Sequence, residues 1–231
     1  MRQRGIWEMT GRTIAIGDIH GCVAALDALL EAIDPRPDDL IVTLGDYIDR
    51  GPDSRGVLDR LVELDRRCKL VPLLGNHEVM LLQALGNERA ATLWRECGGE
   101  ATLASYGGDL SDIPREHLRF FTRCRRFYET DSHLFVHANY DAELPLDQQS
   151  DELLLWTHIR HRMPKPHRSG KVAVVGHTPQ GGRRVLETPH LICLDTCCYG
   201  DGCLSAMELA TLQLWQATPA GETWASLETP E

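Results

Sequence analysis

The chain has 231 residues, of which 42% are hydrophobic and 25% are charged, and its formal net charge is −10. At about 150 residues per domain, this length favours one domain with an insertion, and the composition excludes disordered, collagen-like and coiled-coil proteins. The acidic charge argues against binding of nucleic acid or of an anionic membrane through the whole surface.

The sequence carries no signal for a membrane or for export. No segment approaches the roughly 18 consecutive apolar residues that a membrane span requires. Residues 1–10 lack the apolar core of a signal peptide. We therefore expect a cytoplasmic protein with no membrane partner and no nucleic-acid partner, while the oligomeric state stays open.

The eight cysteines are expected to be free thiols, because none has the CxxC spacing and a cytoplasmic chain of this size needs no disulfide framework. Four of them lie between Cys193 and Cys203. Their spacing fits no standard zinc pattern, so a buried strand followed by a turn is the preferred interpretation, with a soft-metal site as the alternative.

Apolar runs and helical patterns alternate along the first 85 residues. The predicted strands cover 12–17, 40–44 and 70–74, and the predicted helices that follow them cover 22–33, 54–67 and 78–85. Alternation at intervals of about 30 residues is typical of βαβ units in a layered α/β fold. Such sheets bind ligands at the carboxyl ends of their strands.

The rest of the chain departs from this rhythm. Residues 86–125 read as a helical cap or insertion with aromatic residues, Trp94 among them, in its own small core. Further strands are predicted at 134–137, 172–175 and 191–194, followed by an antiparallel pair at 203–209 and 211–215. We expect a single domain over residues 1–231, with a loose, acidic tail over 217–231.

Five short motifs follow predicted strands. They are GDIHG (17–21), GDYIDRG (45–51), GNHE (75–78), HAN (137–139) and GHT (176–178). Each alone is more often a turn or a buried histidine, but five in order favour one shared site. Asp, His and Asn without thiolate suit Mn²⁺, Fe²⁺ or Zn²⁺. A pair of ions about 3.5–4 Å apart could use all five motifs and would catalyse in-line displacement at phosphorus.

The motif set from Gly17 to Thr178 resembles that of the bacterial phosphoprotein phosphatases, a branch of the calcineurin-like, binuclear metallophosphoesterases. The resemblance implies a four-layer α/β fold, a central β-sandwich flanked by helices, with two divalent ions at the strand ends. Mn²⁺ is the expected metal, and Fe²⁺ and Zn²⁺ are alternatives. The implied ligands are Asp18 and His20 for the first ion, Asp46 as the bridge, and Asn76, His137 and His177 for the second.

The physical reading agrees with that resemblance. Two divalent ions outweigh two ligating aspartates, and Arg50 adds positive charge, so a phosphate dianion is attracted despite the net charge of −10. A water between the ions is the expected nucleophile, attacking phosphorus without a covalent phosphoenzyme. By the resemblance, His77 is the general acid, and Asp49 holds its imidazole oriented and protonated. An ion pair in a surface turn is the alternative for Asp49 and Arg50.

The phosphate is expected to contact Arg50, Asn76 and a second arginine. The family usually supplies that arginine from a helix before the GHT strand, and here Arg160 is the first choice and Arg162 the reserve. The surrounding residues 160–171 carry five basic residues and no acid. This segment either steers phosphorylated substrates or is a solvated basic loop.

Two departures from the family pattern concern the rim of the site. Asn139 stands where glycine is common, and residues 195–202 (DTCCYGDG) replace a glycine-rich run. Neither removes an expected ligand, so both bear on specificity rather than on reaction type.

Three functions compete. The GDYIDRG and GNHE motifs favour hydrolysis of phosphoserine and phosphothreonine, with phosphotyrosine as a further substrate, in a protein or peptide. The alternative is a symmetrical diadenosine tetraphosphate hydrolase or another small-molecule phosphoesterase; the tetraphosphatase branch usually has Asp at the position of Glu78 and lacks the full Asp-Arg-Gly loop. A non-catalytic phosphate-binding module would require a lost ligand, and none is lost.

Overall fold

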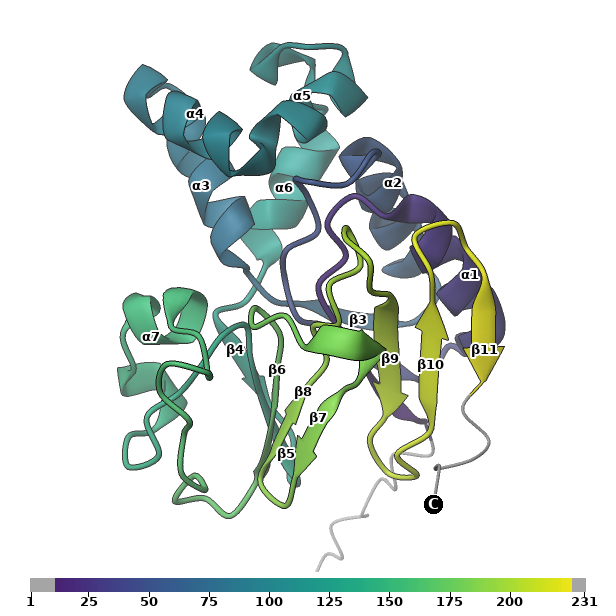
Figure 1. The fold of residues 1–231 in the computed structure, drawn as a ribbon, viewed down its shortest axis with the longest axis vertical. Helices are drawn as coiled ribbons and strands as arrows, with labels where there is room; N and C mark the ends of the chain where they lie inside the picture. The colour runs from purple at the N-terminus through teal and green to yellow at the C-terminus, as the bar shows by residue number, and fades with distance from the viewer. Residues whose placement is uncertain (1–10, 226–231) are drawn as a thin grey trace, which may run out of the picture.

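The aliphatic runs of the sequence form two mixed β-sheets that pack face to face, with helices on both outer faces (Figure 1). The computed structural model describes residues 11–225. Residues 1–10, where no signal peptide is expected, and 226–231 of the expected tail lie outside the described part. The architecture confirms the expected β-sandwich flanked by helices.

The first sheet has six strands in the order β11-β10-β9-β1-β2-β3. Strands β1 to β3 are parallel, whereas β9, β10 and β11 continue the sheet antiparallel from β1. Their bounds are β1 (Thr13–Ile16), β2 (Leu40–Thr43), β3 (Lys69–Pro72), β9 (Leu204–Glu208), β10 (Leu214–Ala217) and β11 (Thr223–Ala225). The predicted antiparallel pair near the end of the chain is therefore confirmed.

The second sheet has five strands in the order β4-β5-β6-β8-β7. Strands β5, β6 and β8 are parallel, and β4 and β7 form antiparallel edges. The bounds are β4 (Phe127–Glu129), β5 (His133–Val136), β6 (Val172–Val175), β7 (Leu186–Thr188) and β8 (Leu191–Cys193). The carboxyl ends of the central strands of both sheets point toward the same side of the sandwich (Figure 1).

The pleat of each strand divides its side chains between two layers of core. In β1, Ile14 and Ile16 pack against the helices, whereas Ala15 faces the other sheet. In β5, Leu134 faces α7 (Asp151–Trp156) and Phe135 enters the space between the sheets. Strands buried on both faces read as continuous apolar runs, which is why their alternation is invisible in the sequence.

The helices on the first sheet include the predicted insertion. They are α1 (Val23–Ile33), α2 (Ser54–Leu64), α3 (Asn76–Ala84), α4 (Glu88–Trp94), the π-helical turn η1 (Arg95–Gly99), α5 (Glu100–Tyr106) and α6 (Arg115–Arg123), with the short turn η2 (Leu110–Asp112) between α5 and α6. The short turns η3 (Leu146–Gln148) and η4 (Gly181–Arg183) lie elsewhere. Aromatic side chains of the insertion, including Trp94 and Phe121, join the same core as α1 and α2. The insertion is thus packed into the main body.

One expectation about the tail is wrong over much of its length. Residues 217–225, predicted to be loose, contain the end of β10 and the strand β11, which pairs with β10 in antiparallel register. Its three residues are too few to show alternation. The short edge strands β4 and β7 and the six-residue helix α7 were not predicted, for the same reason of length.

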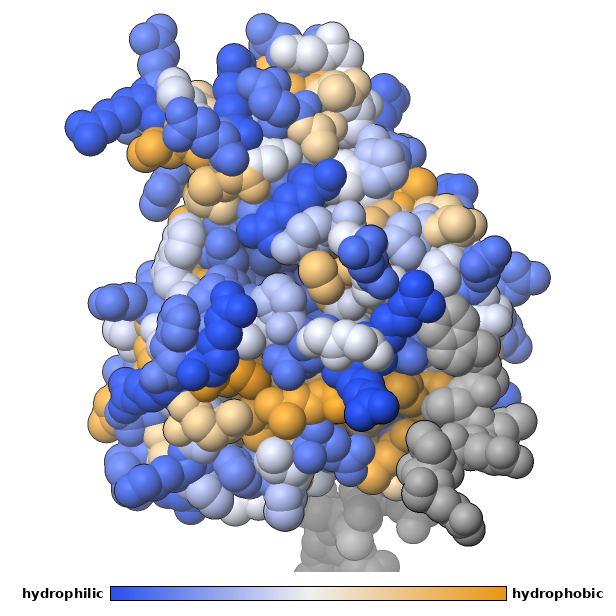
Figure 2. Space-filling view, viewed as in Figure 1, coloured by the Kyte–Doolittle hydropathy of each residue, from blue (hydrophilic) through white to orange (hydrophobic). Residues whose placement is uncertain are grey.

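The surface drawn in Figure 2 is mainly hydrophilic over the helices and in the middle of the view, and apolar residues gather in a band across its lower half. Within residues 11–225, no helix is both long enough and apolar enough to span a bilayer.

A buried ion pair fixes the start of β1 to the start of β2. Asp39 is fully buried, and its carboxylate accepts hydrogen bonds from Arg12 Nη2 at 2.6 Å, from the Arg12 backbone at 3.0 Å and from the Arg36 backbone at 2.8 Å. Burial alone would raise the pKa of Asp39, but these bonds outweigh it and hold the pKa below its ordinary value.

We predict that Asp39→Asn lowers the free energy of unfolding by about 2 kcal/mol at pH 7, because it weakens several hydrogen bonds to a buried charge. Urea unfolding measures this loss. The stabilisation is present above about pH 4, the ordinary pKa of Asp, and is lost as pH falls through the lowered folded pKa, so the two proteins should converge in acid. Asp27→Asn, which breaks the exposed pair with Arg60, is the control and should cost less than about 1 kcal/mol; equal losses would contradict the prediction.

Candidate active site

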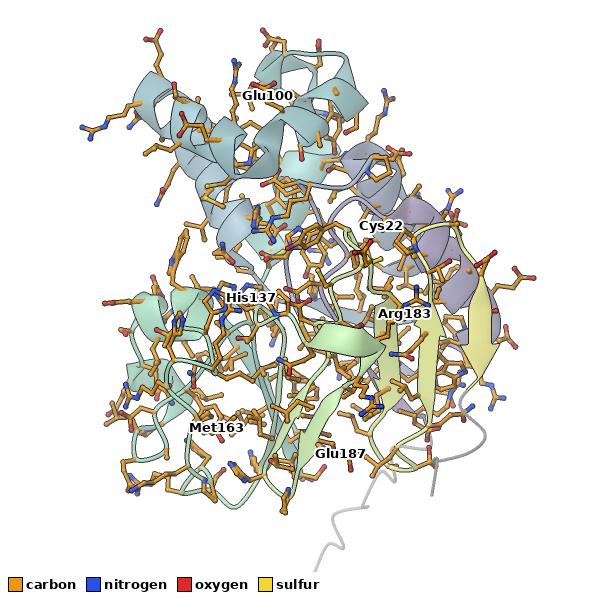
Figure 3. All side chains as sticks on the ribbon, viewed as in Figure 1. Cys22, Glu100, His137, Met163, Arg183 and Glu187 are labelled. Carbon is orange, nitrogen blue, oxygen red and sulfur yellow. The ribbon has the colours of Figure 1, made fainter. Side chains whose placement is uncertain are left out.

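The five motifs lie on loops that follow the carboxyl ends of parallel strands. The loops after β1, β2 and β3 come from the first sheet, and those after β5 and β6 from the second. Figure 3 shows His137 at the upper ends of the strands, whereas Met163 and Glu187 lie toward the opposite end of the sandwich. The two sheets thus bring residues that are up to 159 positions apart into one site, as shown by the hydrogen bond between His177 and Asp18.

The backbone is strained where these loops turn. Five residues of the motifs adopt positive φ although none is glycine: His20, Asp46, Asp49, Arg50 and His177, with values from 46° to 71°. Such conformations cost of order 1–3 kcal/mol each and persist only where the surroundings enforce them. They cluster at this site, which marks it as functional.

Buried hydrogen bonds lock the first three loops together. The Asp46 carbonyl accepts from the backbone of Ile19 and of His20, at 3.0 and 2.8 Å. Glu78, fully buried at the start of α3, accepts from the backbone of Asp46, Tyr47 and Gly75 at 2.8–3.0 Å. Burial raises the pKa of Glu78 to about 8. Its carboxylate serves the loop backbone rather than the cleft.

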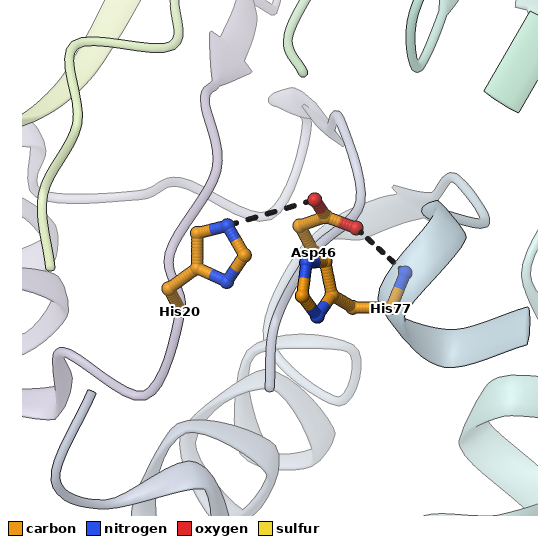
Figure 4. Close-up of side chains that lie close together, drawn as sticks. All are labelled: His20, Asp46 and His77. Carbon is orange, nitrogen blue, oxygen red and sulfur yellow. Dashed lines mark hydrogen bonds and ion pairs between the residues drawn. The ribbon is translucent and has the colours of Figure 1, made fainter. Parts of the chain in front are cut away.

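The imidazoles of His20 and His137 are each fixed through Nδ1. His20 Nδ1 donates to the Ile48 carbonyl at 2.9 Å, and His137 Nδ1 donates to the Leu44 carbonyl at 2.7 Å. Each ring therefore presents its Nε2 lone pair inward, at 3.6 and 3.5 Å from Asp46 Oδ2. Figure 4 shows His20 and Asp46 in this arrangement, with the His77 backbone donating to the other Asp46 oxygen.

A second group of acceptors meets at His137. Its Nε2 lies 3.0 Å from Asn76 Oδ1 and 3.2 Å from His177 Nδ1. His177 directs its Nε2 to the Trp156 carbonyl at 3.1 Å, so its Nδ1 also offers a lone pair. Burial lowers the pKa of His20 and of His177 to about 3, which keeps both rings neutral near pH 7. Lone pairs this close repel each other unless a cation lies between them.

Asp18 gives the most direct test of whether a cation fits. Its Oδ2 accepts from the His177 backbone at 2.9 Å, whereas Oδ1 is buried with no hydrogen-bond partner. Burial, followed by the charges of Asp195 and Asp46, raises the pKa of Asp18 well above its ordinary value. A Cβ on Gly176 would lie 2.0 Å from this oxygen, so glycine leaves the space open. The unpaired oxygen and the histidine lone pairs together fit divalent cations.

His77 and Asp49 form a buried pair beside this centre. Asp49 Oδ2 lies 2.7 Å from His77 Nδ1, and both side chains are at most 1% exposed. Burial opposes the charge on His77, but Asp46 and the bond to Asp49 outweigh it and raise the pKa of His77. His77 also lies close enough to His20 and Asp46 to complete a three-residue metal group, and Asp46, His137 and His177 form another.

A cleft of about 310 Å³ is bordered by most of these residues, namely Asp18, His20, Asp46, Asn76, His77 and His177, whereas His137 and Asp49 are not among its lining. Arg50 and Arg160 both line it, whereas Arg162 is directed elsewhere and pairs with Asp141 at 3.1 Å. Arg160 follows α7, which ends at Trp156, so it comes from a turn and not from a helix as the family pattern implied. Asn139 does not reach the cleft; it is buried and donates to the Arg162 carbonyl.

Sequence reasoning missed several residues of the lining. They are Asp195, Trp156, His158, Pro179 and Tyr199. Asp195 is 3% exposed, and burial raises its pKa to about 6. Tyr199 packs edge-on against His20 and accepts a hydrogen bond from Arg50 Nη1 at 2.8 Å. The run 195–202 was singled out only as a departure from the family pattern, and that difference was the available signal.

The cysteine-rich segment is not part of this centre. All eight cysteines are free thiols, as expected. In the described part of the chain, the residue groups that could hold a metal contain no cysteine. Cys193 lies in β8 and Cys198 in the turn that follows it, which matches the preferred interpretation of this segment.

Comparison with known proteins agrees with the fold. The chain is 33% identical over 189 residues to serine/threonine-protein phosphatase 1 of Salmonella typhimurium, covering 77% of this chain and 83% of the relative. It is 31% identical over 221 residues to a symmetrical bis(5'-nucleosyl)-tetraphosphatase of Bordetella pertussis, covering 92% and 75%. A cold-active protein-tyrosine phosphatase of a Shewanella species has a similar fold, with a TM-score of 0.65 at 17% identity over 93% and 80% of the chains.

The family itself is shown by sequence. The model of the calcineurin-like phosphoesterases matches residues 11–203, which include all five motifs. This family uses a centre of two divalent metal ions, for which His and Asp groups of this chain could provide ligands. The chain therefore belongs to the calcineurin-like phosphoesterases and is a metallophosphoesterase, a hydrolase of phosphoric ester bonds.

Proposed function

We propose that this enzyme is a phosphomonoesterase that hydrolyses phosphoserine and phosphothreonine in proteins or peptides, with phosphotyrosine as a further substrate. The observation that carries the proposal is the buried His77–Asp49 pair, which lies beside a group of His, Asp and Asn atoms suited to bind metal ions. Arg50 and Arg160 line the cleft at this site. That set combines a proton donor with two cationic groups for phosphate.

The chain's donor set suits two divalent cations, Mn²⁺ in first place. Asp18 and His20 would hold one ion, Asp46 would lie between both, and Asn76, His137 and His177 would hold the other. When bound, such a pair polarises a phosphoryl group and lowers the pKa of a water molecule.

The other residues act on the substrate. Arg50 and Arg160 present planar guanidinium groups that grip two phosphate oxygens each, and Asn76 adds an amide beside them. His77 Nδ1 is occupied by Asp49, which leaves Nε2 to give its proton to the leaving oxygen. The raised pKa of His77 favours the protonated form that this role needs.

The size of the cleft supports a small phosphoryl substrate. At about 310 Å³ it lies near the lower end of the range of roughly 300–1,000 Å³ typical of ligand pockets. This volume suits a phosphate and a short side chain, with the rest of a peptide outside. A ligand with two nucleosides would lie largely on the surface.

A symmetrical dinucleoside tetraphosphatase is the second candidate. The observation that favours it is the relative from Bordetella pertussis, which matches over a wider part of this chain than the phosphatase relative does. Glu78 discriminates less than its motif suggests, because its carboxylate bonds to loop backbone and not to the cleft.

We predict that the chain binds two divalent ions and that Asp18→Asn weakens the binding of one of them by at least about 100-fold. Loss of an outer partner of a metal ligand already costs 10–100-fold, and loss of a ligand should cost more. Mass spectrometry of Mn²⁺ in metal-stripped, reconstituted protein measures the stoichiometry. Asp59→Asn, on α2, is the matched control. Unchanged metal content in Asp18→Asn would exclude Asp18 as a ligand.

His77→Asn should lower turnover by about 10²–10⁴ with both ions still bound, because general acid catalysis contributes about that much. Turnover of a phosphothreonine peptide and metal content are measured on the same preparation. If the variant loses an ion instead, His77 is a ligand, as its distance to His20 and Asp46 would permit.

Substrate class is tested by comparing kcat/KM for a phosphothreonine peptide with kcat/KM for diadenosine tetraphosphate, on one Mn²⁺-reconstituted preparation. We expect the peptide to be preferred by at least tenfold, because only its phosphoryl end needs to enter the cleft. A preference for the dinucleotide would reject the phosphatase proposal and support the second candidate.

A further inference from the structure

Two side chains of the helical insertion donate hydrogen bonds to Asp49. Trp94 Nε1, at the end of α4, lies 2.8 Å from Asp49 Oδ2, and Thr102 Oγ1, in α5, lies 2.6 Å from Asp49 Oδ1. The Asp49 backbone N–H also bonds to Thr102 Oγ1, at 2.9 Å. Trp94, Thr102 and Asp49 are all fully buried. Both carboxylate oxygens of Asp49 are therefore held from the insertion.

The π-helical turn between Trp94 and Thr102 contacts Arg50, the residue that follows Asp49 in its loop. The Gly98 carbonyl accepts from the Arg50 backbone at 3.1 Å, and a Cβ on Gly98 would lie 2.8 Å from Arg50 Cγ. Gly99 is required for a related reason, because a Cβ there would lie 2.4 Å from the Trp94 ring. Gly98 thus permits close packing on Arg50, and Gly99 permits close packing on the Trp94 ring.

We propose that Trp94, Gly98 and Thr102, here called the insertion clamp, are positioning residues for proton donation by His77. This inference rests on the proposed role of His77 as general acid. The clamp fixes the Asp49 carboxylate in one orientation, and Asp49 in turn fixes the His77 ring. The insertion therefore supports the chemistry and is not only a cover for the core.

The need for a clamp follows from the geometry of the loop. Asp49 and Arg50 both have positive φ, at 71° and 69°, a conformation that surrounding contacts must enforce. Without Trp94 and Thr102, one oxygen of a buried carboxylate loses its donor, and the side chain is free to turn away from His77. Ser54 Oγ, 3.1 Å from the Asp49 backbone N–H, would keep the loop itself attached.

A structural role and a positioning role differ in their dependence on the leaving group. A phosphothreonine substrate expels an alkoxide, which needs a proton, whereas 4-nitrophenyl phosphate expels a phenolate of much lower basicity, which needs little help. A fault in proton donation therefore slows the first substrate selectively. A fault in folding or metal binding slows both alike.

The decisive variant is Thr102→Val, which keeps the shape of the side chain and removes the hydroxyl. We expect kcat for a phosphothreonine peptide to fall about tenfold, which corresponds to about 1.4 kcal/mol, with KM unchanged and turnover of 4-nitrophenyl phosphate within about twofold. Thr102→Ser, which restores the hydroxyl, should recover kcat. Trp94→Phe, which keeps an aromatic ring and removes the N–H, should show the same selectivity.

Thr92→Val is the matched control, since it removes an exposed hydroxyl of the same insertion that bonds only to the Glu88 carbonyl. His77→Asn sets the reference. If His77→Asn slows both substrates equally, the general acid role fails and the clamp with it. If His77→Asn is selective but Thr102→Val slows both substrates equally or neither, the clamp alone is overturned. Mn²⁺ content and thermal unfolding of each variant confirm that the folded, metal-loaded proteins are compared.

Discussion

The structure depends on one unfavourable arrangement, a set of acceptor atoms that meet with no donor between them. The imidazoles of His20, His137 and His177 each turn one nitrogen to a backbone carbonyl and the other toward the shared centre. The buried carboxylates of Asp18 and Asp46 face the same space. Repulsion of this kind is tolerated only because the strand ends and loop hydrogen bonds leave these groups no alternative, and cations convert it into binding energy. The positive φ angles of the same loops are part of what enforces it.

The Asp, His and Asn residues of the five motifs could be predicted from the sequence as candidates for a metal site. Each lies in a short motif that follows a strand, so its place at the strand end can be recognised from neighbouring residues. The parallel strands of a layered α/β fold followed from short apolar runs, and the antiparallel pair β9–β10 from alternating runs, whereas the sandwich was implied by the resemblance to the family. The residues that were missed do not lie in a recognisable motif directly after a predicted strand. Asp195 and Tyr199 lie in a turn without a motif, and the partners of Trp94 and Thr102 are 45 and 53 positions away. A tryptophan in an apolar segment is predicted to be a core residue whether or not its N–H donates a functional hydrogen bond.

The choice between the two candidate functions also depends on which side chains the tertiary structure brings to the cleft. Glu78 distinguishes the GNHE motif of this chain from the motif usual in the tetraphosphatase branch. Its carboxylate accepts hydrogen bonds from the backbone of two loops and does not contact the cleft. It shapes the site without selecting the substrate. Selection of the substrate must then come from other side chains that line the cleft, among them Trp156, Arg160 and Tyr199. Trp156 is 40% exposed, so a bound peptide or base could cover an apolar surface next to the charged centre.

The charge of the cleft depends on its metal content. Asp18, Asp46 and Asp195 bring acidic groups to the lining, and Arg50, Arg160 and a protonated His77 oppose them. Divalent cations bound by the carboxylates would make the cleft more positive and strengthen its attraction for a phosphate dianion. Affinity for metal and affinity for phosphate are therefore coupled, and by thermodynamic linkage each raises the other by the same factor. Such coupling would let a chain with a net charge of −10 bind an anionic substrate, because the positive charge of the arginines and of bound cations is concentrated in one cleft.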